Sequence, residues 1–110
     1  MQRMIRHIVF FTAKSPENLP AILDGLRLLG TIPHVSHFEV TPNRKLDQIG
    51  NNVDVVVYAE FESEAALRAY KAHPTYAEAT RRVRPLRETR FAADFEASEE
   101  VAGAIRRRSA

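Results

Sequence analysis

Residues 53–76 have the sequence VDVVVYAEFESEAALRAYKAHPTY, and they decide the fold because a strand pattern changes into a helix pattern within them. The first half is rich in β-branched and aromatic residues that alternate between an apolar and a mixed face, which is typical of a strand. Its apolar face comprises Val53, Val55, Val57, Ala59 and Phe61. Ser63 provides an N-cap for the helix that follows, and His73, as the residue before a proline, is disfavoured in helical geometry. The stretch therefore predicts a strand, a helix that ends at His73, and a second helix that begins at Pro74 and runs to about residue 84.

Three further strands and one further helix are predicted on either side of this stretch. Strand patterns occupy residues 4–13, 33–42 and 86–96, and the first of them is apolar on both alternating faces. After Asn18, a favourable N-cap, leucine and isoleucine recur at helical spacing, and Gly30 is the predicted end of that helix. The order β-α-β-β-α-β predicts an α+β, ferredoxin-like fold, in which a four-stranded antiparallel sheet carries its helices on one face.

The helix-free face of this sheet is expected to be strongly apolar, because the helix-covered face cannot accommodate all apolar residues of the strands. The residues that we assign to the helix-free face are Val9, Phe11, Val57, Phe91 and Phe95. Monomers seldom expose so large an apolar area to water. We therefore predict a homodimer in which two such faces meet and form a dimeric α+β barrel.

Composition limits the protein to a few classes. At 110 residues, we expect one domain over residues 1–96, followed by an extension over 97–110 that forms either a short helix or a frayed tail. No apolar run approaches the roughly 20 residues that span a bilayer, so no membrane insertion is expected. The chain has no cysteine, which excludes a disulfide and a cysteine nucleophile and makes the cytoplasmic location the default expectation. A net charge of +2 does not demand a nucleic-acid partner.

Metals, nucleotide cofactors and nucleic acids are not expected. His34 and His37 are three residues apart, so a strand directs them to opposite faces, and His37 and Glu39 have no third ligand nearby. The sequence has no P-loop, no glycine-rich dinucleotide fingerprint and no serine elbow of a hydrolase. RNA-recognition domains share the strand and helix order, but residues 53–62 have valines and carboxylates where those domains carry exposed aromatic residues. We therefore predict no metal, no cofactor and no bound nucleic acid.

Four segments of the chain resemble one known family. They are MIRHIVFF (4–11), GLRLLGTIPHVSHFEVTPN (25–43), the stretch 53–76 and FAADFE (91–96). In this order they resemble the stress-responsive dimeric α+β-barrel family, the Dabb domains, over about residues 4–96. The resemblance implies a ferredoxin-like protomer, a dimeric barrel and a pocket between the sheet and the helices of each protomer. Most members of the family have no established reaction.

The resemblance also implies candidate site residues. Plant polyketide cyclases of the olivetolic acid cyclase type belong to this family and use a tyrosine and a histidine in a cofactor-free aldol condensation. Their tyrosine matches Tyr70, and the histidine of their His-Pro step matches His73. Their catalytic histidine falls on Tyr76, and a phenol with an ordinary pKa of about 10 is a poor general base at neutral pH. An early strand histidine beside the pocket of the family matches His7.

Each candidate has a structural interpretation beside the functional one. The catalytic candidates His7, Tyr70 and Tyr76 could instead be packed residues whose polar atoms find partners inside the protein. His73 could cap carbonyl groups at the end of the helix. The candidate ligand-binding residues are His73, Val9 and Phe11.

Two functions are compatible with these features. The first is a stress-responsive homodimeric barrel protein of unassigned activity, whose small apolar pocket binds a hydrophobic molecule. The alternative is a cofactor-independent acid/base enzyme, such as a polyketide cyclase or another lyase or isomerase, in which His7 and Tyr70 polarise or deprotonate a carbonyl compound. The replacement of the cyclase histidine by Tyr76 favours the first function.

Overall fold

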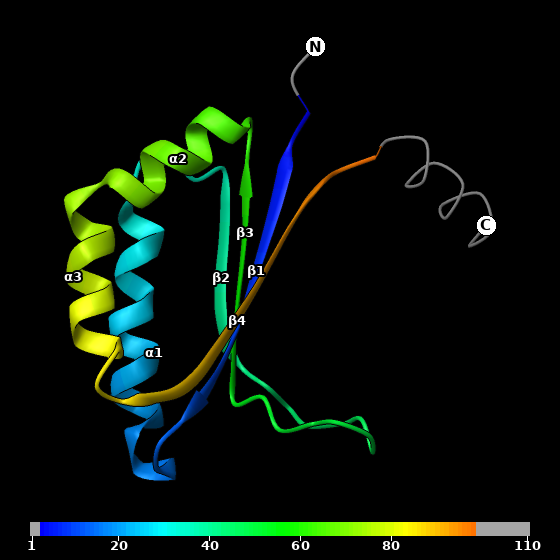
Figure 1. Cartoon of the computed structure of the whole chain (residues 1–110), viewed down its shortest axis with the longest axis vertical. Helices are drawn as coiled ribbons and strands as arrows, with labels where there is room; N and C mark the ends of the chain where they lie inside the picture. The colour runs from blue at the N-terminus through cyan, green and yellow to red at the C-terminus, as the bar shows by residue number, and fades with distance from the viewer. Residues whose placement is uncertain (1–2, 99–110) are drawn as a thin grey trace.

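The computed structural model describes residues 3–98, and its elements follow the predicted order. The strands are β1 (Ile5–Ala13), β2 (His37–Pro42), β3 (Val55–Phe61) and β4 (Arg87–Glu96). The helices are α1 (Leu19–Arg27), α2 (Glu64–Ala72) and α3 (Pro74–Val83), and the short 3₁₀ helices η1 (Pro16–Asn18) and η2 (Leu28–Thr31) flank α1. Figure 1 shows the three α-helices on the same side of the sheet. The predicted ferredoxin-like arrangement is therefore confirmed.

The sheet has the strand order β2-β3-β1-β4, and each neighbouring pair of strands is antiparallel. Residues that stand directly opposite each other in such pairs point to the same face of the sheet. His7 on β1 stands opposite Ala59 on β3 and Asp94 on β4. Because His7 and Ala59 are both buried, this set of residues lies on the face that the helices cover.

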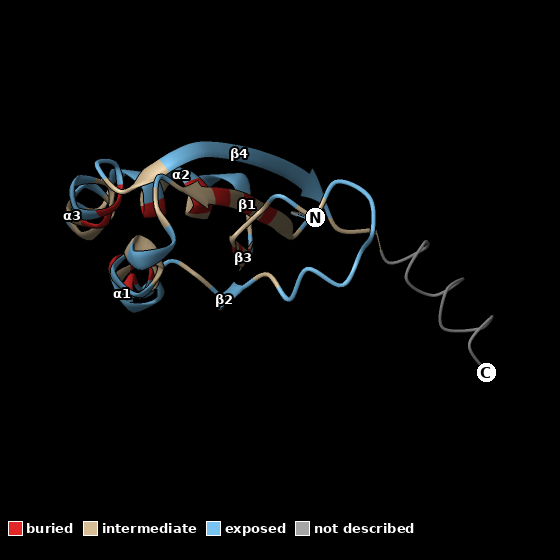
Figure 2. Cartoon of the chain, turned by 90° about the horizontal axis from the view of Figure 1, so that it is seen from below, coloured by how far each residue is buried: buried red, intermediate tan, exposed pale blue. Residues whose placement is uncertain are grey.

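The pairing of β1 with β4 corrects part of the predicted dimer surface. Val9, Phe11 and Val57 are 3%, 5% and 1% exposed and belong to the core between sheet and helices, so their assignment to the helix-free face was wrong. Phe91 and Phe95 do lie on the helix-free face, where they are 64% and 44% exposed. The error arose because β1 is apolar on both faces, so its alternation alone cannot show which face is covered. Figure 2 shows β4 exposed along its length, while the buried segments gather between the helices and the sheet.

The junction between α2 and α3 forms as its sequence predicts. The Ser63 side chain accepts a hydrogen bond from the amide of Ala66 and so caps α2. His73 has extended backbone geometry, ends α2, and accepts a hydrogen bond from the amide of Thr75 at 3.1 Å through Nδ1. Pro74 then occupies the first position of α3, where its missing N–H is not needed.

The first helix ends earlier than predicted. Asn18 is the N-cap residue of α1 as expected, although its side chain makes no capping hydrogen bond. At the other end, α1 stops at Arg27 and the chain tightens into η2, so that Gly30 lies within a 3₁₀ turn. A Cβ atom at Gly30 would stand 2.7 Å from the Phe38 ring, which explains why a glycine suits this position. The turn thus lets β2 pack close to the end of α1.

Two other expectations concern the ends of the chain and membranes. Within residues 3–98, no helix has the length and apolar character that a bilayer crossing requires. The predicted extension over 97–110 lies outside the described residues from position 99 onward.

Candidate functional site

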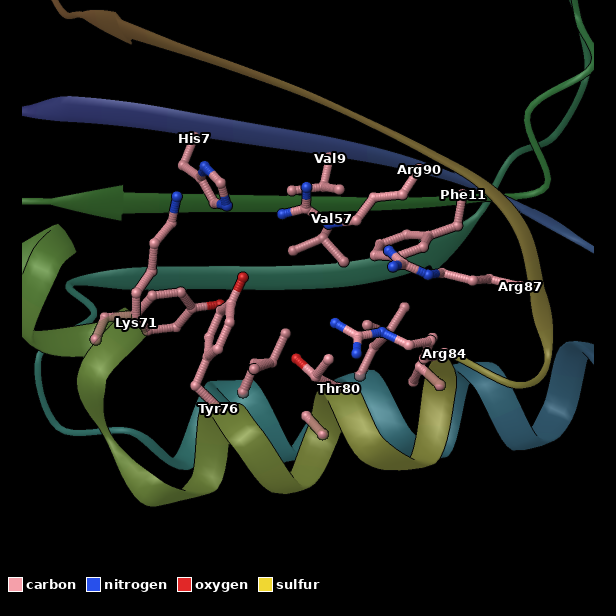
Figure 3. A pocket seen from close by; sticks show the side chains of 15 residues that line it. His7, Val9, Phe11, Val57, Lys71, Tyr76, Thr80, Arg84, Arg87 and Arg90 are labelled. Carbon is pink, nitrogen blue, oxygen red and sulfur yellow. The ribbon is translucent and has the colours of Figure 1, made fainter.

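A pocket of about 310 Å³ lies between the covered face of the sheet and the helices. Its apolar wall is formed by Val9 and Phe11 of β1, Val57 of β3, Leu26 of α1, Leu29 of η2 and Val83 of α3. Polar side chains complete the lining: His7, Tyr70, Lys71, Tyr76, Thr80, Arg84, Arg87 and Arg90. Figure 3 shows His7, Lys71, Tyr76 and the three arginines around the cavity. All three catalytic candidates, and Val9 and Phe11 among the three ligand-binding candidates, therefore share one cavity.

His7 forms the buried polar centre of this pocket. Its side chain is almost fully buried, and its Nδ1 lies 2.5 Å from Oδ1 of Asp94 on the neighbouring strand. An ionised carboxylate only accepts hydrogen bonds, so Nδ1 donates the proton and Nε2 keeps its lone pair. Burial lowers the pKa of His7 from its ordinary value of 6.5, and the hydrogen bond and charge of Asp94 only partly oppose this effect. The imidazole is therefore neutral at pH 7 and held in one tautomer, which is the state of a general base.

Tyr70 presents a hydroxyl group that finds no hydrogen-bond partner among residues 3–98. The residue is 0% exposed, and its ring packs against Phe61 at a centroid distance of 4.8 Å and against Tyr76 at 5.3 Å. Burial raises the pKa of Tyr70 far above its ordinary value, so the phenol keeps its proton. An unpaired buried hydroxyl costs roughly 1–3 kcal/mol, and a ligand oxygen in the pocket would satisfy it.

Tyr76 contributes a second phenol from the first turn of α3. Its side chain is half-buried, and Figure 3 shows its hydroxyl pointing into the pocket toward His7. The α2–α3 junction contributes to this placement, because α3 begins at Pro74 and Tyr76 therefore lies in its first turn. The pocket therefore combines one imidazole with two phenols.

His73 does not line this pocket. Its Nδ1 is engaged with the Thr75 amide, and its ring lies 6.3 Å from the His34 ring in an edge contact. The structure thus gives His73 a capping role at the helix junction. Its side chain caps the amide groups at the start of α3, whereas the sequence predicted a cap on the carbonyl groups at the end of α2. Among the described residues, no group of three or more histidines and carboxylates is arranged to hold a metal ion.

Sequence reasoning missed Asp94 and the positive side chains of the pocket. Asp94 could have been found by pairing the face of residues 90, 92 and 94 with the face of His7, but that requires the register between β1 and β4. Arg84, Arg87 and Arg90 were visible in the sequence as a local excess of charge. Their convergence on one cavity depends on the geometry of the turn at residues 84–86 between α3 and β4. Pro85 marks this turn in the sequence but does not show where the arginine side chains point.

We predict that Asp94→Asn lowers the pKa of His7 further. The carboxylate raises this pKa through its hydrogen bond and its charge, whereas an amide supplies no negative charge, so burial prevails more strongly in the variant. The measurement is a pH titration of the His7 ring resonances by NMR. Glu88→Gln removes a charge from the same strand outside the pocket and serves as the control. A titration midpoint that stays in place or moves to higher pH in Asp94→Asn would contradict the assignment.

The fold and the pocket define a class of protein: a ferredoxin-like α+β protomer with a mixed apolar and polar cavity between its sheet and helices. The sequence profile of the stress responsive A/B barrel domain, Dabb, matches residues 5–97. The chain therefore belongs to the Dabb family.

Solved structures with the same fold support this placement. A Dabb family protein with a ferredoxin-like fold from Mesorhizobium loti is 30% identical, with a TM-score of 0.72 over 88% of this chain and 99% of that one. A dimeric ferredoxin-like protein of unknown function from Thermobifida fusca is 26% identical, with a TM-score of 0.75 over 88% of this chain and 93% of that one. A hydroxynitrile lyase from Passiflora edulis shares the fold at 18% identity, with a TM-score of 0.74 over 90% and 97% of the two chains. Among curated proteins, none matches the chain.

Proposed function

We propose that the protein is a homodimer whose pockets bind a small carbonyl compound and transfer protons on it without a cofactor. The observation that carries this proposal is the buried pair of His7 and Asp94, which shares a cavity with the unpartnered hydroxyl of Tyr70. The dimeric state is supported by the similar protein from Thermobifida fusca, which is dimeric, and by the exposed Phe91 and Phe95 on the helix-free face.

The roles of the two central groups follow from their protonation states. Neutral His7, oriented by Asp94, accepts a proton at Nε2 from the carbon next to the carbonyl group. Tyr70 remains protonated and donates a hydrogen bond to the carbonyl oxygen, which becomes an enolate oxygen as the proton leaves. Tyr76 lines the same cavity and is placed to donate a second hydrogen bond. The hydroxynitrile lyase of the same fold is an instance in which this architecture supports an enzyme.

A second candidate is binding without turnover. Tyr76 stands at the position where the cyclases of this family have their histidine, and a phenol is a poor proton acceptor at neutral pH. With one imidazole only, the pocket has no second base to complete a condensation. The protein would then retain a ligand and leave it unchanged.

Deuterium incorporation from D₂O into a panel of aryl ketones and β-keto thioesters distinguishes the two candidates. We expect the protein to accelerate exchange next to the carbonyl group and His7→Gln to reduce this rate by roughly 10²- to 10⁴-fold. His37→Gln is the matched control, because His37 also pairs with a carboxylate, Glu39 at 3.0 Å, but lies exposed on β2. Circular dichroism checks that both variants fold.

Two outcomes contradict the acid/base proposal. One is an exchange rate that His7→Gln leaves unchanged. The other is a panel compound that binds in the pocket without any protein-dependent exchange, which would favour binding without turnover.

A further inference from the structure

We propose that the natural ligand of the pocket is an amphipathic anion, with an apolar body against the aliphatic wall and a carboxylate or phosphate group against Arg84, Arg87 and Arg90. This inference rests on the proposed function and names the ligand class of the same pocket. It replaces the expectation of a purely hydrophobic ligand.

The three arginines reach the cavity from the chain segment that joins α3 to β4. Arg84 is the C-cap residue of α3, and Arg87 and Arg90 belong to β4. Figure 3 shows Arg84 and Arg87 at one end of the pocket and the Arg90 side chain reaching from β4 toward its middle, beside Val9, whereas Lys71 lies at the other end beside His7. The positively charged part of the pocket is thus formed where the end of α3 and the start of β4 meet at a short turn.

An irregularity in β4 places two of these arginines on one face. Residues three apart in a regular strand point to opposite faces, so Arg87 and Arg90 would normally diverge. The register shifts between Thr12 and Ala13, where Ala13 pairs with Arg87 and the intervening Glu88 has no partner residue on β1. One extra residue in a strand has this effect. Arg87 and Arg90 therefore both stand opposite residues of the helix-covered face, Ala13 and Phe11.

Within the described residues, these positive charges pair with no carboxylate. In the part of the chain from residue 3 to 98, the ion pairs involve other residues, and none includes Lys71 or an arginine of the pocket. By contrast, Arg27, Arg68 and Arg81 on the outer helix surfaces each pair with a carboxylate of their own helix. Burial lowers the pKa of Arg87, and the charges of Arg90 and Arg84 lower it further, so Arg87 is repelled by both of these neighbours. An anion between them would offset this repulsion, and guanidinium groups bind carboxylate and phosphate with paired hydrogen bonds.

The apolar part of the cavity favours a ligand that also has an apolar portion. Val9, Phe11 and Val57 from the sheet face Leu26 and Leu29 across the space, and none of the five has a polar side chain. A volume of about 310 Å³ is at the small end of the range for ligand cavities, so a compact organic acid is suited to it. A neutral hydrocarbon would fill the apolar part of the cavity but leave the guanidinium groups without a counter-charge.

Calorimetric titration of the intact protein with octanoate, octyl phosphate and 1-octanol tests this inference. We expect the better of the two anions to bind at least roughly tenfold more tightly than the alcohol, because charge-assisted hydrogen bonds contribute this much. The order of octanoate and octyl phosphate distinguishes a carboxylate site from a phosphate site. Arg87→Gln and the double variant Arg84→Gln/Arg90→Gln should each weaken binding of that anion roughly tenfold, while their affinity for 1-octanol stays unchanged.

The control is Arg81→Gln, which removes a charge from α3 on the outer surface and should leave all affinities unchanged. Equal affinities for the anions and 1-octanol, unchanged anion binding by the pocket variants, or no binding of any of the three probes would each overturn the inference. Its failure is separable from failure of the acid/base proposal, since His7→Gln should still bind the anion. Anion binding without deuterium exchange overturns only the acid/base proposal, and exchange without anion selectivity overturns only this inference.

Discussion

Val55→Asp is expected to abolish the cooperative folding of this protein. Val55 is 0% exposed and stands between Phe11 of β1 and Pro42 of β2 on the helix-covered face of the sheet. A carboxylate there would be buried without a partner, which costs several kcal/mol, and the whole stability of a domain is only about 5–15 kcal/mol. We expect a loss of unfolding free energy above about 4 kcal/mol, seen as a missing thermal transition in circular dichroism.

The neighbouring residue provides a matched control for this prediction. Val56 points to the helix-free face and is half-buried in the protomer, so Val56→Asp should retain a cooperative transition. The same chemical change one position along the strand thus separates the two faces. Equal losses in both variants, or a normal transition in Val55→Asp, would show that the face assignment is wrong.

Phe91→Asp is expected to convert the proposed dimer into a folded monomer. Phe91 stands opposite Phe10 on the helix-free face and is 64% exposed in the protomer, so the substitution leaves the core untouched. In a symmetric dimer the change occurs twice and places two carboxylates in one apolar interface. The dissociation constant should rise by more than about a hundredfold.

Size-exclusion chromatography with light scattering measures this change, and circular dichroism confirms that the monomer is folded. Ala77→Asp adds the same charge on the exposed surface of α3 and should leave the dimer intact. A persistent Phe91→Asp dimer would exclude the helix-free face as the interface. A wild-type protein that is monomeric at micromolar concentration would contradict the dimer itself.

The candidate site was only partly visible in the sequence. His7, Tyr70 and Tyr76 were named from the resemblance to the Dabb family, and the structure brings all three into one cavity. Asp94 was missed, because nothing in the local pattern of β4 connects it to a histidine that lies 87 residues earlier. The sequence likewise showed the arginines of the pocket only as a local excess of positive charge, and it did not show that they line one cavity.

The sequence by itself determined the elements, because alternation, capping residues and prolines act over a few neighbouring residues. Ser63, His73 and Pro74 set the ends of α2 and α3 in this way, and Val55–Phe61 forms a strand for reasons contained in its own pattern. Only the tertiary structure decided which face of each strand the helices cover, because β1 is apolar on both sides. The packing of the helices against Val9, Phe11 and Val57 sets that choice. The register of β1 against β4, with its shift of one residue, then determines which residues of β4 share the covered face. The same register places Asp94 beside His7 and turns Arg87 and Arg90 toward one pocket, since strand pairing joins residues that no local pattern relates.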